Sequence, residues 1–226
     1  LYARFNAVAI PCGNTGAQMG GWFRKPIESV DDFKGLRIRT PGLLSKVYEK
    51  LGAIPQQIAG SDIYPALEKG SLDAVEFVGP FDDEKLGFAK VAQYYYGPGV
   101  MELGANLAFT VNRDAWAGLP PRYQAVLRAA CAESAADLLA KYDANNISAL
   151  RRLIAQGTQL KSWPVPVMQA MQDATRAVLD EYAAADASFA EVLKSWRAFR
   201  SDQLLWASVN DGAASQFLMS TRQKGV

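Results

Sequence analysis

The sequence contains no histidine, and this single absence removes several classes of functional site. Ser-His-Asp and Cys-His catalytic arrangements, HExxH zinc sites and the commonest general base all need an imidazole. The only cysteines are Cys12 and Cys131, which are too few for a Cys-rich zinc centre. One disulfide between them is possible by count. Both lie in apolar stretches, however, where a free buried thiol is the usual case, so the sequence favours free thiols.

Strong charge and long apolar runs are also missing. The 24 basic and 23 acidic residues leave a net charge of +1 without a basic run, which argues against a nucleic-acid-binding surface. The longest apolar runs fall far short of the ~18 residues that a membrane helix needs. The 226 residues, half of them apolar, are enough for one large or two small globular domains. The chain opens on LYARFNAVAI, without an initiator Met or the features of a signal peptide, so we expect an upstream part to be missing.

Short helical and strand patterns alternate between residues 27 and 96. Ser29 and Ser61 are suitable N-caps for two of the expected helices. The expected strands cover 36–39, 53–58 and 72–78, and the expected helices cover 30–34, 43–51, 61–67 and 80–89. This order predicts parallel strands joined by right-handed crossovers. In such sheets ligands bind beyond the carboxyl ends of the strands.

The second half of the chain is richer in helical patterns. We expect strands at 104–112 and 158–163, helices at 121–142 and 147–155, and an almost wholly helical segment at 166–219 with an interruption near 184–188. The sequence therefore predicts an α/β fold with mostly parallel strands and a helical C-terminal region.

A glycine-rich segment at 13–22, GNTGAQMGGW, lacks the pattern of a P-loop or of a dinucleotide-binding turn. It is either a tight turn between elements or a loop that faces a ligand. In the second case its glycines would let the backbone approach the ligand, and Gln18 would offer an amide oxygen or NH2 group.

The strand at 36–39 carries two arginines on one face. Side chains alternate along a strand, so Arg37 and Arg39 lie on one face and Leu36 and Ile38 on the other. A parallel strand is normally covered on both faces, so Arg39 would need an anion, and its planar fork matches a carboxylate. The alternatives to an anionic ligand are that Arg39 is exposed to solvent or forms an ion pair with a structural aspartate.

Two acidic residues lie in apolar surroundings. Glu76 stands near the end of the strand at 72–78, and Glu102 repeats the pattern later in the chain. An unpaired buried carboxylate is costly, so Glu76 needs Arg39, a metal ion, or both. Two acids with an amide oxygen and a main-chain carbonyl would form an all-oxygen site, which suits sodium or calcium and not zinc. The aromatic residues Trp22, Phe77 and 94–96 either wall a pocket or, more commonly for such positions, belong to the core.

Several segments match a known family. They are GNTGAQMGGWFRKPI, DDFKGLRIRTPG, PQQIAGSDIYPALEKGSLDAVEFVGPFDDEKLGF and YYYGPG. They resemble the solute-binding proteins (DctP family) of tripartite ATP-independent periplasmic (TRAP) transporters, and most of all the pyruvate-type binders of 2-oxo acids. The resemblance implies a two-lobed periplasmic receptor that closes on its ligand by hinge motion, performs no catalysis and delivers a small 2-oxo or 2-hydroxy monocarboxylate to TRAP membrane permease subunits.

The resemblance also implies roles for individual residues. Arg39 would clamp the substrate carboxylate, and Gln18 would touch both substrate and cation. Glu76 would be a cation ligand, and Glu102 would lie at a further acidic position near the cation. Phe77 stands where close relatives commonly have Trp; its carbonyl would still bind the cation while its ring changes the pocket wall. The cation would be sodium or calcium, with sodium preferred.

The family topology further implies a division of the chain into four parts. A strand of the truncated first lobe would cover 1–11, the second lobe 12–103, a returning first-lobe strand and helix 104–143, and C-terminal helices 144–226. These last helices resemble those that swap between subunits in dimeric members, so a homodimer is expected.

Two alternatives remain beside this interpretation. A binder of a dicarboxylate or a sugar acid would use Arg39 with Glu76 as its ion-pair partner and would need no metal. A metal-assisted lyase of 2-oxo acids would use Glu76 as its base. The missing histidine and the lack of a nucleophile–base pair count against the lyase.

Overall fold

The computed structural model describes residues 1–222 and separates them into two compact units, the first covering Leu1–Val178 and the second beginning at Leu179. The strands are β1 (Ala7–Asn14), β2 (Gly21–Phe23), β3 (Arg37–Arg39), β4 (Ile54–Gln56), β5 (Ala74–Val75), β6 (Tyr94–Gly97), β7 (Asn106–Asn112) and β8 (Gln159–Ser162). The α-helices are α1 (Gly42–Lys50), α2 (Gly60–Glu68), α3 (Pro80–Leu86), α4 (Arg113–Gly118), α5 (Pro121–Ala155), α6 (Val165–Ala185), α7 (Ala187–Val209) and α8 (Asp211–Arg222). Short 3-10 helices are η1 (Tyr2–Phe5), η2 (Val30–Phe33) and η3 (Phe88–Lys90). None of the described helices is both long and apolar enough to span a membrane.

The main sheet has the strand order β4-β3-β5-β2-β6-β8. The parallel pairing expected for 27–96 is confirmed, because β3 runs parallel to both β4 and β5. Strand β2 is the exception and pairs antiparallel with β5 and β6. The loop before β2 is bonded to Val78 and Tyr96, which lie just beyond β5 and near the end of β6. The chain therefore enters β2 at the edge of the sheet where β5 and β6 end.

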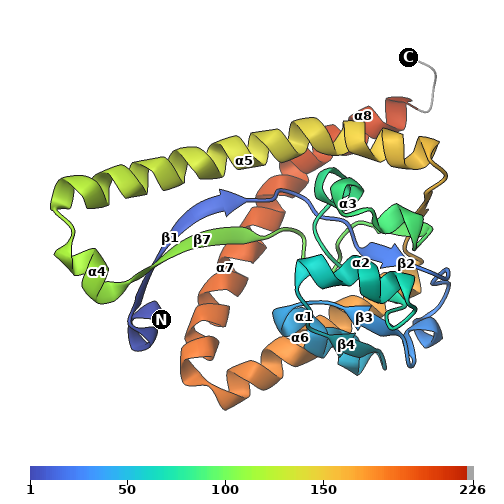
Figure 1. Cartoon of the computed structure of the whole chain (residues 1–226), viewed down its shortest axis with the longest axis horizontal. Helices are drawn as coiled ribbons and strands as arrows, with labels where there is room; N and C mark the ends of the chain where they lie inside the picture. The colour runs from blue at the N-terminus through green and yellow to red at the C-terminus, as the bar shows by residue number, and fades with distance from the viewer. Residues whose placement is uncertain (223–226) are drawn as a thin grey trace. The chain divides into compact units, whose positions relative to one another are not determined.

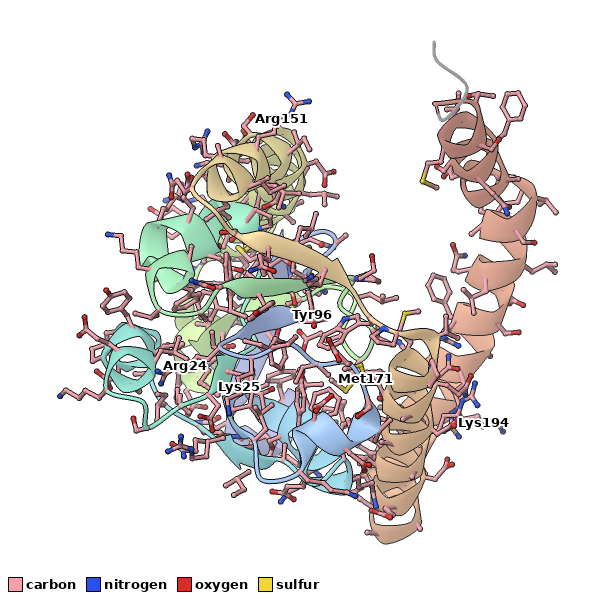
Figure 2. The ribbon with its side chains drawn as sticks, turned by 90° about the vertical axis from the view of Figure 1, so that its right-hand side faces the viewer. Arg24, Lys25, Tyr96, Arg151, Met171 and Lys194 are labelled. Carbon is pink, nitrogen blue, oxygen red and sulfur yellow. A yellow bond between two sulfur atoms is a disulfide. The ribbon has the colours of Figure 1, made fainter. Side chains whose placement is uncertain are left out.

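Strand alternation gives the sheet two separate hydrophobic cores. On one face Phe23, Ala74 and Tyr96 pack with α1 and α6. Figure 2 shows Met171 on α6 directed toward the sheet that carries Tyr96. On the other face Trp22, Val75 and Tyr95 pack with α2, η3 and the end of α5; the Trp22 and Tyr95 rings stack at 3.9 Å between centroids. The aromatic residues at 94–96 and Trp22 thus belong mainly to the core.

A separate antiparallel ribbon is formed by β1 and β7, with an irregularity between Pro11 and Gly13. Helix α5 runs along this ribbon (Figure 1), and Ile10, Trp116 and Cys131 form a small core there. Cys12 of β1 and Cys131 of α5 are joined in a disulfide, so the expectation of free thiols is wrong. Cys131 is buried among apolar residues as expected, but the packing of α5 on β1 brings the two sulfurs together.

Two of the expected local features need correction. The helices expected at 121–142 and 147–155 are one continuous helix, α5, because residues 143–146 contain neither Gly nor Pro and nothing interrupts the backbone ladder. Ser61 does not cap α2, which begins at Gly60 without a side-chain cap. By contrast, Ser29 and Asp32 form a capping box at η2, as the sequence suggests.

In the second unit, α7 begins at the interruption expected near 184–188. Its N-cap is Asp186, whose carboxylate accepts hydrogen bonds from the amides of Ser188 and Phe189. Arg197 forms an ion pair with Asp180 at 2.7 Å. The division of the chain into first-lobe and second-lobe segments stays a prediction.

Candidate functional site

The carboxyl ends of β3 and β5 lie beside the loop that contains Gln18. Three main-chain hydrogen bonds fix this loop. The main-chain N–H of Gln18 donates to Leu103 O at 2.9 Å, and the main-chain N–H of Met19 donates to Val78 O at 3.0 Å. The main-chain oxygen of Gln18 accepts from the N–H of Gly99 at 3.0 Å. The loop is therefore attached both to the segment that follows Glu76 and to the segment around Glu102. The glycine-rich segment is thus anchored to both of these distant segments, and its role as a loop that faces a ligand stays a prediction.

Arg39 is half-buried at the end of β3. Its Nη1 donates to the main-chain oxygen of Glu76 at 3.0 Å, and its Nε donates to Ile58 O at 3.4 Å. The guanidinium carbon lies 5.3 Å from the centroid of the Phe77 ring. Burial lowers the pKa of Arg39, while the charge of Glu76 opposes that shift. Within residues 1–222 Arg39 forms no ion pair, so this charge lacks a carboxylate partner.

Arg37, two residues earlier, is satisfied in a different way. Its Nε and Nη2 donate to the two carboxylate oxygens of Asp73 at 2.8 and 2.7 Å. A pair with a structural aspartate was one of the alternatives that the sequence allowed for Arg39. The structure has such a pair at Arg37 and not at Arg39. Arg39 remains available to an anionic ligand.

Glu76 is the most perturbed acid of the site. Its side chain is 5% exposed, and burial, assisted by the charge of Glu102, raises its pKa to about 8. The positive charge of Arg39 acts in the opposite direction but is outweighed. Burial also raises the pKa of Glu102. A carboxyl in such surroundings becomes an anion at neutral pH most readily when a cation joins it.

Strand alternation separates the side chains into two groups at this edge. Phe77 packs edge-on against Phe88 on the α2 side of the sheet, and Arg39 lies over Phe77. Glu76 points to the other side, into a small pocket that it shares with Glu102. The main-chain oxygen of Glu76 connects the two groups through its bond to Arg39.

Gln18 carries an unsatisfied acceptor. Its Nε2 donates to Thr15 Oγ1 at 3.0 Å, but its buried Oε1 has no hydrogen-bond partner. Buried polar atoms without partners are rare and call for a missing ligand, ion or water. An amide oxygen, two carboxylates and a main-chain carbonyl would together form a donor set that suits a hard cation. Residues 1–222 contain no cluster of three or more His, Cys, Asp or Glu side chains that could hold a metal ion.

Sequence reasoning missed three buried polar groups near this edge. The hydroxyls of Thr40 and Tyr48 have no partners, although both residues are fully buried. The β3–β5 register pairs Arg39 with Val75, and its continuation sets Thr40 opposite Glu76. Asp83, in the first turn of α3, is buried and accepts hydrogen bonds from Trp22 Nε1 and Tyr95 Oη. Helical periodicity indicated that Tyr48 is buried, but no sequence pattern reveals an unpaired hydroxyl.

An α/β domain with an arginine that lacks an ion-pair partner beside a buried carboxyl group is compatible with a protein that binds an acidic solute. Residues 2–186 match the family of bacterial extracellular solute-binding proteins, family 7 (DctP). The chain belongs to this family.

Individual relatives agree with this assignment. The chain is 46% identical over 222 residues to a monocarboxylate 2-oxoacid-binding periplasmic protein of Nostoc; the match covers 98% of the chain and 61% of that relative. The chain thus spans less than two thirds of this relative's length.

Two solved structures are similar in fold and sequence. A TRAP transporter solute-binding protein from Bordetella bronchiseptica, solved as a mixed-occupancy dimer with calcium and picolinate, matches with a TM-score of 0.96 and 44% identity, over 100% of this chain and 67% of that one. A TRAP periplasmic solute-binding protein from Pseudoalteromonas atlantica, with sodium and pyruvate bound, matches with a TM-score of 0.91 and 38% identity, over 95% and 66% of the two chains.

Proposed function

We propose that this chain is the ligand-binding part of a periplasmic receptor for a small 2-oxo or 2-hydroxy monocarboxylate such as pyruvate, held together with a sodium or calcium ion. The observation that carries the proposal is the unpaired guanidinium of Arg39, bonded to the main-chain oxygen of the buried acid Glu76. Such an arrangement offers one positive charge to a carboxylate and, beside it, oxygen ligands for a cation.

Each residue has a distinct role in this proposal. Arg39 binds the ligand carboxylate through its planar fork, and the Phe77 ring, which lies against the guanidinium, would contact the ligand on the same side of the sheet. Gln18, Glu76, Glu102 and the Phe77 carbonyl supply oxygen ligands for the cation. When bound, the cation supplies an attraction for the oxygen next to the ligand carboxylate. A plain fatty acid lacks that oxygen and is expected to bind much more weakly.

The proposal extends to the setting of the receptor. It would deliver its ligand to TRAP membrane permease subunits and would act without catalysis. It would also form a homodimer through its C-terminal helices. The exposure of large apolar side chains on α7, with Trp196 at 48%, Phe199 at 64% and Trp206 at 59%, supports an interface there.

A thermal-melt experiment on the protein expressed from its complete gene tests the proposal. The melting temperature is measured in sodium-free potassium buffer with chelator, then with sodium or with calcium, each with and without pyruvate. Propionate serves as the control ligand without the 2-oxygen. A ligand about 100-fold above its Kd adds ~2.7 kcal/mol, which is a shift of several degrees.

Each outcome of that experiment has a definite meaning. A shift that needs both pyruvate and a cation supports the proposal. A shift produced by a dicarboxylate or by galacturonate in chelator supports the alternative receptor, in which Glu76 only pairs with Arg39. No shift with any of these acids contradicts the proposed function.

A further inference from the structure

Tyr48 buries a hydroxyl group that bonds to nothing in the described chain. The side chain comes from α1, is 0% exposed and packs its ring edge against Phe33, with 5.8 Å between centroids. Its hydroxyl oxygen is buried without a hydrogen-bond partner. An unsatisfied buried hydroxyl costs about 1–3 kcal/mol, so a protein retains one only where something else requires it.

The pocket that Tyr48 lines contains few side chains that could accept a hydrogen bond from its hydroxyl. Tyr48 lines the same pocket as Glu76 and Glu102. The aromatic Trp163 in that pocket donates its own Nε1–H to Pro98 O at 2.9 Å and offers no acceptor. The remaining lining side chains are apolar or glycine. Among the side chains of the pocket, the two carboxylates are therefore the only strong acceptors.

Tyr48 is a donor at any ordinary pH. Burial, with the negative charge of Glu76 as a further cause, raises the pKa of its hydroxyl well above the usual value. A protonated hydroxyl beside an acid can supply the hydrogen bond that an ionised carboxylate prefers.

We propose that Tyr48 is a positioning residue of the cation site: once the ion is bound, its hydroxyl donates to the Glu76 carboxylate and holds it in the orientation that binds the ion. This inference rests on the proposed function, since it assigns a supporting partner to a cation ligand of that site. A carboxylate that binds an ion through one oxygen keeps free lone pairs, and a donor to those lone pairs stabilises the bound arrangement. Such partners typically change metal affinity by about 10- to 100-fold.

The variant Tyr48→Phe separates this role from a structural one. It removes the oxygen and keeps the ring that packs in the core. Calcium affinity, measured by titration calorimetry on the protein from its complete gene, is expected to fall about 10- to 100-fold. The melting temperature in chelator is expected to stay the same or to rise, because the variant no longer buries an unpaired hydroxyl.

Tyr96→Phe is the matched control. Tyr96 lies in the same hydrophobic core, but its hydroxyl accepts from the Ile27 amide at 2.8 Å and donates to Ile27 O at 3.1 Å. The expected pattern is the reverse of that for Tyr48: a lower melting temperature in chelator and an unchanged calcium affinity.

Three results would overturn the inference, in distinguishable ways. If wild-type protein binds calcium and Tyr48→Phe binds it equally well, the positioning role is wrong and the proposed function stands. If Tyr48→Phe is less stable than wild type in chelator, the hydroxyl serves the fold and not the site. If wild-type protein binds neither calcium nor sodium, the cation part of the proposed function fails and the inference fails with it.

Discussion

The Nη1 atom of Arg39 lies 3.0 Å from the main-chain oxygen of Glu76, and this bond joins the end of β3 to the end of β5. It orients the guanidinium without neutralising it, because a carbonyl oxygen carries only a partial charge. The bond therefore leaves the positive charge of Arg39 free for a ligand carboxylate.

Replacing Arg39 with alanine should abolish ligand binding. The loss of charge-assisted hydrogen bonds to the carboxylate is expected to weaken pyruvate binding by about 100-fold or more, as measured by titration calorimetry with cation present. The control is Arg37→Ala on the same strand, whose guanidinium is already paired with Asp73. Arg37→Ala should lower the melting temperature slightly and keep its affinity; the idea fails if the two variants lose affinity equally.

Replacing Glu76 with glutamine should remove the cation dependence. Glutamine keeps the size of the side chain and one oxygen but loses the charge that attracts a hard cation. The melting temperature of Glu76→Gln with pyruvate is expected to be nearly the same in calcium and in chelator. Glu84→Gln is a suitable control, because Glu84 is ion-paired with Arg152 on the surface. A cation-induced shift of wild-type size in Glu76→Gln would remove this carboxylate from the site.

The disulfide between Cys12 and Cys131 should contribute markedly to stability. It closes a loop over a sequence separation of 119 residues, and a cross-link of that size is worth up to about 4.7 kcal/mol in the chain-entropy account. We therefore expect a reductant to lower the melting temperature by several degrees. The double variant with alanine at both positions should melt near the reduced wild type and should not respond to reductant. A wild-type melt unaffected by complete reduction would contradict this expectation.

Much of this architecture could be predicted from the sequence because its causes are local. The helical spacing of apolar residues predicted the helix at 43–51, which the structure has at Gly42–Lys50. Ser29, as an N-cap, predicted the start of η2. The arginine alternation on β3 and the acid at the end of the next parallel strand follow from the two-residue period of a strand. Those patterns drew attention to Arg39 and Glu76, and the family resemblance supplied the roles expected of them.

The remaining features depend on contacts between distant segments. Whether Arg39 or Arg37 has an aspartate partner depends on the position of Asp73, 36 residues further along the chain from Arg37. The disulfide depends on the packing of α5 against β1, and the antiparallel direction of β2 depends on where its preceding loop crosses the sheet. None of these is encoded in a spacing of neighbouring residues. The unpaired hydroxyl of Tyr48 cannot be predicted from the sequence either, because it depends on which groups from other segments surround it.

Asp83 should make the fold less stable as the pH rises. Its carboxylate accepts hydrogen bonds from Trp22 Nε1 at 2.9 Å and Tyr95 Oη at 2.7 Å, which favour the charged form. Burial outweighs them and raises its pKa from 3.8 to about 7. Between those two pH values the folded protein holds a proton on Asp83 that the unfolded chain has released. The free energy of unfolding therefore falls as the pH rises from about 4 to about 7.

The variant Asp83→Asn tests this pH dependence, because an amide does not titrate in this range. Melting temperatures of wild type and variant are compared between about pH 5 and pH 8 in chelator. The wild-type decline should be visibly steeper than that of Asp83→Asn. Some decline should persist in the variant, because the pKa of Glu76 is also raised, to about 8, and acts in the same direction. Asp62→Asn, a change at an exposed aspartate in the first turn of α2, should leave the wild-type slope intact. Parallel curves for wild type and Asp83→Asn would mean that Asp83 does not hold its proton in the folded protein.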